Sequence, residues 1–442
     1  MNHFPLVRLV RVACAGLMLA ACAGATGEPI EQVTIYRGGL VWDGEGFVER
    51  DLAISGGRFV DPERAGRRAQ VVQLNGQYVA PAYANAHVHL TQATEEANAH
   101  FLRSGVYYAW NPTTVVLGDN HRAFFARPDT YDVATSQGGI TEPGGHPEGI
   151  YIRYIGPRVY PGRTLEDFLG DAFHYGRTPD EIDATLDLLV SQRADFVKSY
   201  LLYSEEYETR RDDDAYYGYR GINPANAPYL VEAARRRGLL VAFHVETPAD
   251  LVAAGEAGAA VAAHLPGYTS AVTRYTSASR LDASGEAIVA RALTPAEAVR
   301  VVSRGMLLTP TYSLLAQHYH GEQTPEAARL YAAQRAMQAS NLRLLGAAGG
   351  VFLIGTDQAG EVFTEVEYLD GLGVFTRQQV LRMTFETGAR LFPQRRIGCF
   401  QPGCEADFLV LRENPEADIR ALRAIERRVM AGRELAVAPG VN

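Results

Sequence analysis

The stretch Tyr83-Ala84-Asn85-Ala86-His87-Val88-His89 is the most informative part of the chain. Its composition predicts an apolar strand that ends in a His-x-His pair. Side chains alternate along a strand, so His87 and His89 are expected on the same side. Two imidazoles at this spacing can bind a divalent metal ion. A pair of core or surface histidines without a metal explains the same two residues, so the pair alone does not decide between the two interpretations.

Four further polar residues stand at or near the C-terminal end of an apolar stretch. They are Lys198 after Asp195-Phe196-Val197, His244 after Leu239-Leu240-Val241-Ala242-Phe243, His264 after Ala260-Val261-Ala262-Ala263, and Asp357 after Val351-Phe352-Leu353-Ile354-Gly355-Thr356. One such residue is readily explained by chance. Five apolar stretches that all end in this way indicate a common site.

Between residues 82 and 394 the chain alternates apolar strands with helical segments, which is the pattern of βα units. Strand ends are predicted near residues 89, 116, 135, 198, 244, 264, 309 and 357. Helices are predicted over 179–191, 248–257 and 325–347, and another starts after Thr294, which has the spacing of a capping box. The fold class is therefore α/β, with a (β/α)8 TIM-type barrel, in which active groups lie at the C-terminal ends of strands.

The sequence pattern at both ends of the chain is different and is typical of short strands joined by turns. Residues 33–36 and 51–54 are strand-like before Gly56-Gly57, and 406–411 and 425–430 are strand-like near the C-terminus. We predict a small composite β-sandwich domain from residues 30–81 and 395–442, around a barrel domain at 82–394.

The first residues are predicted to be a targeting segment. Arg8 and Arg11 precede an apolar run that is too short to span a bilayer. It ends in Leu19-Ala20-Ala21-Cys22, which resembles the lipobox of a bacterial lipoprotein. The resemblance implies a signal peptide over 1–21, lipidation of Cys22 and a tether over 22–29. An ordinary secretory signal is the alternative. Either interpretation puts the protein in the bacterial cell envelope, lipid-anchored and facing the periplasm, or outside the cell.

Composition agrees with a folded enzyme and argues against nucleic acid as a partner. The chain has 442 residues, 47% hydrophobic and 21% charged, with a net charge of −9. Removing residues 1–21 takes away two arginines and no acid, which leaves −11. Binding to phosphates requires clustered Lys and Arg. A small molecule is the expected partner, with membrane contact only through the lipid anchor.

Two cysteines remain after the leader and Cys22 are set aside, namely Cys399 and Cys404. They flank a tight Phe-Gln-Pro-Gly turn and could form a disulfide in an oxidising compartment. Two free thiols at a hairpin are the alternative. Neither belongs to a metal-type cluster.

Taken together, the six candidate ligands resemble those of the amidohydrolase superfamily, in its dipeptidase-like or imidazolonepropionase-like branch. The matching positions are His87, His89, Lys198, His244, His264 and Asp357. The tail from Arg396 to Phe408, with its Ile-Gly, Pro-Gly and Ala-Asp pairs, is similar to the last hairpin of the family. The chain departs from the family at Asn85, where the family usually has Asp, which removes an acceptor for an imidazole but no ligand.

Lys198 has a special role in this resemblance. A buried, charged and unpaired lysine would be costly, and pairing with an acid or extension to the rim is the alternative. In the family this lysine becomes a carbamate, an anionic oxygen ligand. The resemblance implies that carbamylated Lys198 bridges two divalent ions, one held by His87, His89 and Asp357 and the other by His244 and His264. Zinc suits these ligands, as do manganese, cobalt and iron.

The resemblance also implies the chemistry. A metal-bridging hydroxide would attack a carbonyl, with Asp357 as general base and then general acid toward the leaving amine. The predicted function is hydrolysis of a C–N amide bond in a dipeptide, an N-acyl amino acid or a cyclic amide. An ester, lactone or organophosphate hydrolase is the alternative on the same site, and a non-catalytic binding lipoprotein is a rival from another class.

Two more residues are candidates for binding the substrate. His146, in Thr141-Glu142-Pro143-Gly144-Gly145-His146, resembles a substrate-contacting histidine of those branches, with a surface-loop histidine as the alternative. Tyr200 is expected on the same side of its strand as Lys198, and the alternative is a rim aromatic. Residues 205–220 mix acids, arginines and tyrosines, and could form either a substrate-facing lid or a solvated loop.

Overall fold

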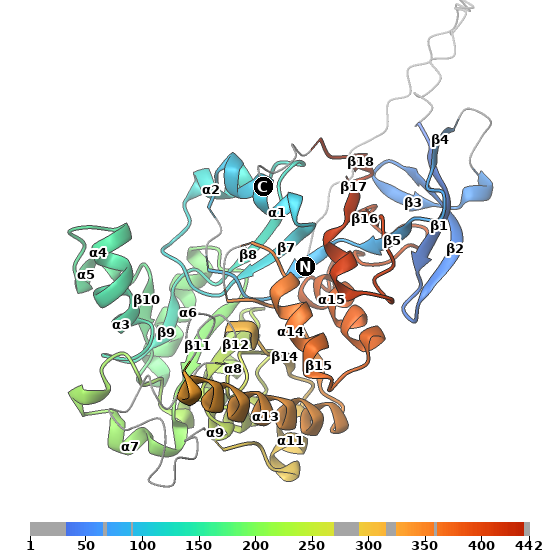
Figure 1. The fold of residues 1–442 in the computed structure, drawn as a ribbon. Coiled ribbons are helices and arrows are strands. Elements are labelled where there is room, and N and C mark those ends of the chain that lie inside the picture. Colours follow the sequence, from blue (N-terminus) through green and yellow to red (C-terminus); the bar gives the residue numbers. More distant parts are fainter. Residues whose placement is uncertain are drawn as a thin grey trace, which may run out of the picture.

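The structure is a computed structural model that describes residues 32–64, 69–89, 92–268, 291–314, 324–357 and 360–436. The predicted leader and tether, with Cys22, lie outside the described residues. Figure 1 shows two parts, a β-sheet built from both ends of the chain and a larger α/β body.

Strands from the two termini pair as predicted into a small β domain, which is one branched sheet among the described residues and not a sandwich of two separate sheets. Antiparallel pairing of Phe408 with Pro81 joins the N-terminal strands to the C-terminal ones, so that blue and red strands lie side by side in Figure 1. The first strand bends near Gly38 and pairs with two parallel partners along its length, so the sheet branches there. The order is β18-β17-β16-β5-β1-β2-β3, with β4 beside β1. The bounds are β1 Thr34–Trp42, β2 Phe47–Ser55, β3 Arg58–Val60, β4 Gln70–Gln73, β5 Tyr78–Pro81, β16 Phe408–Leu411, β17 Ile425–Met430 and β18 Arg433–Glu434.

Parallel strands form the barrel, and among the described residues they occupy eight positions around it. Two short strands share the third position: β8 pairs with β7, and β9 pairs with β11. Strand β10 pairs in parallel with β9. The bounds are β6 Tyr83–Asn85, β7 Val106–Asn111, β8 Asp132–Thr135, β9 Gly139–Thr141, β10 Phe173–Tyr175, β11 Val197–Leu201, β12 Val241–Val245, β13 Val261–Ala263, β14 Leu307–Thr309 and β15 Val351–Phe352. The ring closes where the N–H of Ala86 donates to the carbonyl of Ile354 at 2.8 Å. This confirms the predicted TIM-type barrel.

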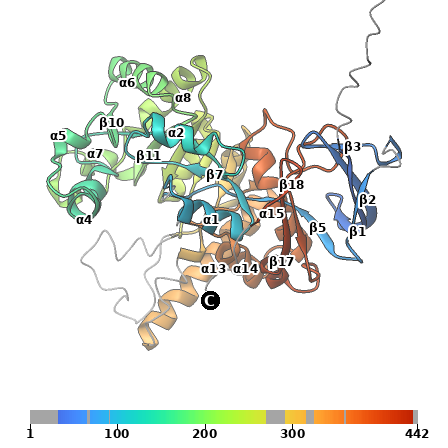
Figure 2. The same cartoon turned by 90° about the horizontal axis from the view of Figure 1, so that it is seen from above.

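Helices cover the outside of the barrel, as Figure 2 shows from above. Those predicted at 179–191, 248–257 and 325–347 are confirmed as α6, α9 and α13. The capping box predicted at Thr294 is also confirmed, because its hydroxyl and the Glu297 carboxylate satisfy each other's backbone N–H groups. The bounds are α1 Glu95–Arg103, α2 Asp119–Phe125, α3 Glu148–Ile150, α4 Gly156–Val159, α5 Leu165–Phe168, α6 Pro179–Ser191, α7 Tyr207–Arg210, α8 Ala227–Arg236, α9 Pro248–Ala257, α11 Pro295–Val302, α13 Pro325–Ala347, α14 Phe363–Leu372 and α15 Arg377–Leu391. No helix among the described residues has the length and apolar character needed to cross a bilayer.

Several strand ends differ from the prediction. The second barrel strand stops at Asn111 instead of near residue 116, because Pro112 has no N–H to continue the ladder. Strand β11 runs on to Leu201, so Lys198 is its second residue and not its last. Strands β6 and β15 are short, which leaves His87, His89 and Asp357 just beyond their ends.

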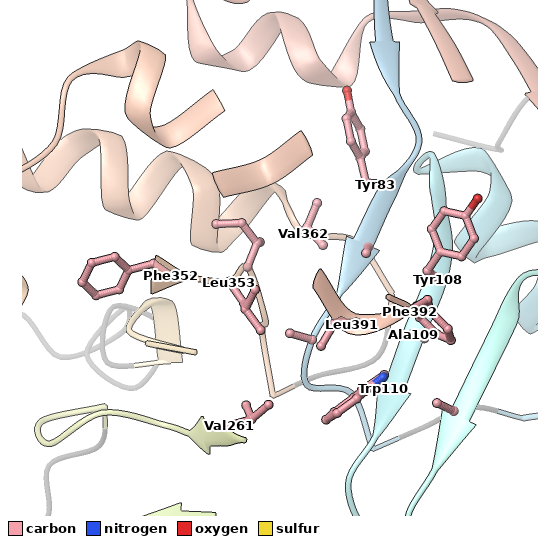
Figure 3. Close-up of a cluster of buried hydrophobic side chains, with 14 of the residues drawn as sticks. Tyr83, Tyr108, Ala109, Trp110, Val261, Phe352, Leu353, Val362, Leu391 and Phe392 are labelled. Atoms are coloured by element: carbon pink, nitrogen blue, oxygen red, sulfur yellow. The ribbon is translucent and has the colours of Figure 1, made fainter. Parts of the chain in front are cut away.

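One large apolar core runs from the barrel into the terminal sheet. Strands β7, β11 and β12 are buried along their whole length, as expected for strands covered on both faces. Figure 3 shows aromatic and aliphatic side chains from β6, β7, β13 and the β15 segment meeting the end of α15. The Trp42 ring on β1 packs 5.1 Å from the Phe385 ring on α15, so the two parts of the molecule share their core.

Cys399 and Cys404 form a disulfide, with Cα atoms 5.9 Å apart. Replacing both cysteines with serine should lower the free energy of unfolding by about 2 kcal/mol, because the bridge closes only a short loop. Chemical denaturation of the two proteins measures this difference. Two free thiols in the unfolded, unreduced wild-type protein would contradict the pairing.

Candidate active site

The candidate residues from the different strands line one cavity of about 350 Å³ at the C-terminal ends of the barrel strands. This volume is in the range of small-molecule sites. The structure brings together all eight residues singled out from the sequence. These are His87, His89, His146, Lys198, Tyr200, His244, His264 and Asp357.

The tightest group is the His-x-His pair with Asp357. The Nε2 atoms of His87 and His89 lie 3.1 Å apart, and one carboxylate oxygen of Asp357 lies 3.1 Å from the first and 2.9 Å from the second. The alternation expected of a strand therefore holds beyond the end of β6. Ligand atoms of His87, His264 and Asp357 all lie within 4.8 Å of one another, so these three side chains could hold a metal ion.

Backbone strain is concentrated at this group. Asp357 has φ +57° and His264 has φ +131°, conformations that side chains with a Cβ rarely adopt. A main-chain hydrogen bond from the N–H of Asp357 to the carbonyl of His87, 2.9 Å long, holds the first of them. Strain of this kind persists only where the surroundings enforce it, and it clusters at functional sites.

Burial sets the charge states that a cation requires. Desolvation lowers the pKa of His87 to about 3 and that of His264 well below its usual value, so both imidazoles stay neutral. Burial acts to raise the pKa of Asp357, whereas hydrogen bonds from the rings of His87 and His89 favour its ionised form, and the resulting pKa lies well below its usual range. Neutral imidazoles and an ionised carboxylate are the forms that bind a metal.

Lys198 lines the same cavity, beside the ring of Tyr200. Its side chain is 1% exposed, and its Nζ has no hydrogen-bond partner among the described residues. Desolvation lowers its pKa to about 7. The two alternatives for Lys198 therefore do not hold, because its amine is not paired with an acid among the described residues and does not reach the rim. A buried amine without a partner fits a group that is modified or that meets a ligand.

Two supporting residues were missed in the sequence and fix which ring nitrogens face the cavity. The hydroxyl of Thr311 donates to the carbonyl of Pro310 at 2.8 Å, so it accepts the 2.7 Å hydrogen bond from Nδ1 of His264. That leaves Nε2 of His264 as the ring nitrogen for a cation. Glu246 accepts from Nε2 of His244 at 3.0 Å and from the Tyr268 hydroxyl at 2.9 Å, so Nδ1 is the nitrogen of His244 that would bind a cation.

The signals for these two residues differ. Glu246 follows His244 by two positions, so strand alternation could have pointed to it. Thr311 lies after β14 at φ +52°, and its approach to His264 depends on neighbouring strands, which no local pattern shows.

Asn85 supports the site in another way. Its side-chain oxygen accepts from the N–H of His87 at 3.1 Å, and its amide donates to the Thr356 hydroxyl at 2.9 Å. It thus ties the segment of His87 to that of Asp357. Nδ1 of His87 has no hydrogen-bond partner among the described residues, in agreement with the expectation that Asn85 provides no acceptor for the ring.

His146 and Tyr200 complete the described part of the cavity. The His146 ring centre lies 4.8 Å from that of His244 and 5.0 Å from that of Tyr200, so it faces the cavity and is not a surface-loop residue. Tyr200 is buried, with its hydroxyl 2.5 Å from that of Thr113. Substrate-binding roles for both remain predictions.

The stretch 205–220 does not line the described cavity, so it is not a substrate-facing lid there. Instead it supports the His146 loop from behind. Arg220 donates from Nη1 to the carbonyl of Arg210 and from Nε to that of Gly144, and its own carbonyl accepts the N–H of His146.

Residues 217–431 match the sequence pattern of the Amidohydrolase family. This match and the shared barrel fold support the amidohydrolase superfamily for the chain. They confirm the predicted enzyme class, a hydrolase acting on carbon–nitrogen bonds. Metal ions are general in this superfamily, and the donor set described above fits them.

Solved structures share the amidohydrolase fold at low sequence identity. Ochratoxinase of A. niger superposes with a TM-score of 0.68 at 19% identity, over 93% of this chain and 97% of that one. A prolidase complexed with N-methylphosphonate-L-proline gives 0.66 at 17% identity, over 91% and 99%. Phenylurea hydrolase B gives 0.65 at 18% identity, over 92% and 97%. No curated protein matched the chain by sequence.

Removing the Thr311 hydroxyl tests the orientation of His264. Thr311→Val should weaken zinc binding by roughly 10- to 100-fold, because the ring loses the acceptor that holds it. Competition with a chromophoric chelator measures this affinity. Thr311→Ser should restore the wild-type value, and Thr309→Val is a matched control, since the Thr309 hydroxyl is buried without a partner among the described residues. Equal affinities for Thr311→Val and Thr309→Val would contradict the assignment.

Proposed function

We propose that the protein is a metal-dependent amide hydrolase whose substrate is a dipeptide, an N-acyl amino acid or a cyclic amide. The observation that carries this proposal is the convergence of Lys198, four histidines and Asp357 in one cavity. The prolidase among the proteins of like fold favours the dipeptidase-like branch.

In this proposal two divalent ions, most simply zinc, are held by the predicted ligands. His87, His89 and Asp357 would hold one ion, His244 and His264 would hold the other, and Lys198, once carbamylated, would supply an anionic oxygen ligand. When bound, such ions lower the pKa of water and polarise a carbonyl.

The side chains then have separate tasks. Asp357 accepts the proton of the attacking water and passes it to the leaving amine, since its carboxylate stays ionised at neutral pH. His146 and Tyr200, which line the same cavity, bind the substrate carbonyl or its substituent. Thr311 and Glu246 keep His264 and His244 in one orientation.

Carbamylation of Lys198 is supported by its surroundings. The amine is buried without a partner, 5.6 Å from the centre of the Tyr200 ring. A pKa of about 7 leaves a large share of it neutral, and the neutral amine is the form that attacks carbon dioxide. The resulting carbamate would supply negatively charged oxygen ligands for the two divalent ions.

We also propose an envelope location, with cleavage before Cys22 and a lipid on its thiol, or secretion. The Cys399–Cys404 disulfide supports an oxidising compartment.

The direct test of function combines metal analysis with a substrate panel. Mature protein loaded with zinc in bicarbonate buffer should contain about two ions per chain and hydrolyse dipeptides or N-acyl amino acids, and a chelator should abolish the activity. Higher rates on lactones or phosphotriesters would favour the alternative hydrolase. Inactive protein that binds no metal would favour a binding lipoprotein.

Lys198→Ala tests the carbamate. The variant should lose one bound ion and about two orders of magnitude or more in kcat, and propionate should restore both in part by filling the hole with a carboxylate. Metal content by mass spectrometry and initial rates give the two readouts. Lys198→Met is the matched control, because it keeps the volume, has no amine and leaves no room for propionate. Full metal content and rate in Lys198→Ala would contradict the carbamate.

A further inference from the structure

The cavity has two unlike sides. The candidate ligands form a polar floor, whereas the segment after His146 together with Val115 forms an apolar wall. The wall is made of Val115, Ile150, Tyr151, Ile155, Val159 and Tyr160. No task in the proposed mechanism needs these side chains.

The wall has its own irregular backbone. Helices α3 and α4 flank a π-helical turn over Tyr151–Ile155, with Gly156 directly after it. Such turns are rare and are frequently found at functional sites. The turn puts Tyr151 and Ile155 on the cavity while Arg153, between them, is directed to Tyr217, with its guanidinium 4.5 Å from the ring centre.

The wall is also preformed. Val115, Ile155 and Tyr160 pack on a small apolar cluster of Tyr151, Phe168, Ala172 and Phe173, which is separate from the main core. Figure 1 places α3, α4 and α5 on the side of the barrel away from the terminal sheet, and Figure 2 shows the same for α4 and α5. Buried Glu148 anchors the start of the segment, accepting from the N–H of Gly144 at 2.9 Å and from the Tyr175 hydroxyl at 2.8 Å.

Exposure and charge indicate what the wall contacts. Val159 is 61% exposed although it lines the cavity, so apolar surface faces water there at a cost in free energy. Among the described lining residues there is no arginine, and Lys198 and Asp357, both on the floor, carry the only formal charges apart from the histidines. A charged substituent placed against the wall would find no oppositely charged group among the described residues that line it.

We propose that this wall is the subsite for an aromatic or branched aliphatic substituent of the scissile amide, uncharged on that side. This inference rests on the proposed amide hydrolysis and names its substrate class. Val159 and Ile155 contact the substituent and determine specificity, and they take no part in the chemistry.

Matched substrates test the class. Zinc-loaded protein is assayed with N-acetyl-phenylalanine, N-acetyl-leucine, N-acetyl-aspartate and N-acetyl-lysine, and with glycine acylated by benzoyl or succinyl. The N-acetyl amino acids vary the amine side of the amide, and the two acylated glycines vary the acyl side. In one of these two sets, the substrates with an apolar substituent should exceed those with a charged substituent in kcat/KM by about tenfold or more. Charged members that equal or exceed the apolar ones on both sides would overturn the inference and leave amide hydrolysis standing. No hydrolysis of any member would overturn both.

Val159→Glu tests the residues. For the better apolar substrate, KM should rise by about tenfold with kcat nearly unchanged, because the wall binds the ground state and the transition state alike. The kcat/KM for N-acetylglycine should not change. Val299→Glu is the matched control, on the outer helix α11 and 58% exposed. A variant Val159→Glu with unaltered KM, or with equal losses on both substrates, would overturn the assignment.

Discussion

Closure of the barrel between its first and last strands is the constraint on which the site depends. Two main-chain hydrogen bonds make it, from Ala86 to Ile354 and from Asp357 to His87. The second runs between two candidate ligands and holds Asp357 at a positive φ. Without this hydrogen bond, a carboxylate oxygen of Asp357 would not lie about 3 Å from the Nε2 atoms of His87 and His89, which are far from it in the sequence. Asn85 reinforces the same junction through its side chain.

Burial then turns this geometry into a cation site. Desolvation keeps the imidazoles of His87 and His264 neutral, and the buried amine of Lys198 has no hydrogen-bond partner among the described residues. Hydrogen bonds from behind select one ring nitrogen on His264 and on His244. The polar floor alone would suit many substrates, because one barrel supports many chemistries. In our proposal, the preformed apolar wall restricts the class of substrate. Most of it belongs to the segment 147–160, which contains none of the candidate ligands.

Much of this arrangement was predictable from sequence, for identifiable reasons. Alternation in a strand set the direction of His87 and His89, and capping signals set the starts of α9 and α11. Strand ends were less predictable, since they depend on pairing partners. Pro112 stops β7 early, and Lys198 lies inside β11. Thr311 and the apolar wall were missed, because their positions follow from tertiary packing and from a π-helical turn.

Zinc-loaded crystals measured at the zinc absorption edge would test the central claim most directly, because anomalous scattering locates the ions independently of activity. The account predicts density within about 2.0–2.2 Å of ring nitrogens of His87 and His89 and of a carboxylate oxygen of Asp357, with a second peak beside His244 and His264. Saturating zinc that gives no peak at these side chains, which instead stay hydrogen-bonded to one another, would contradict it.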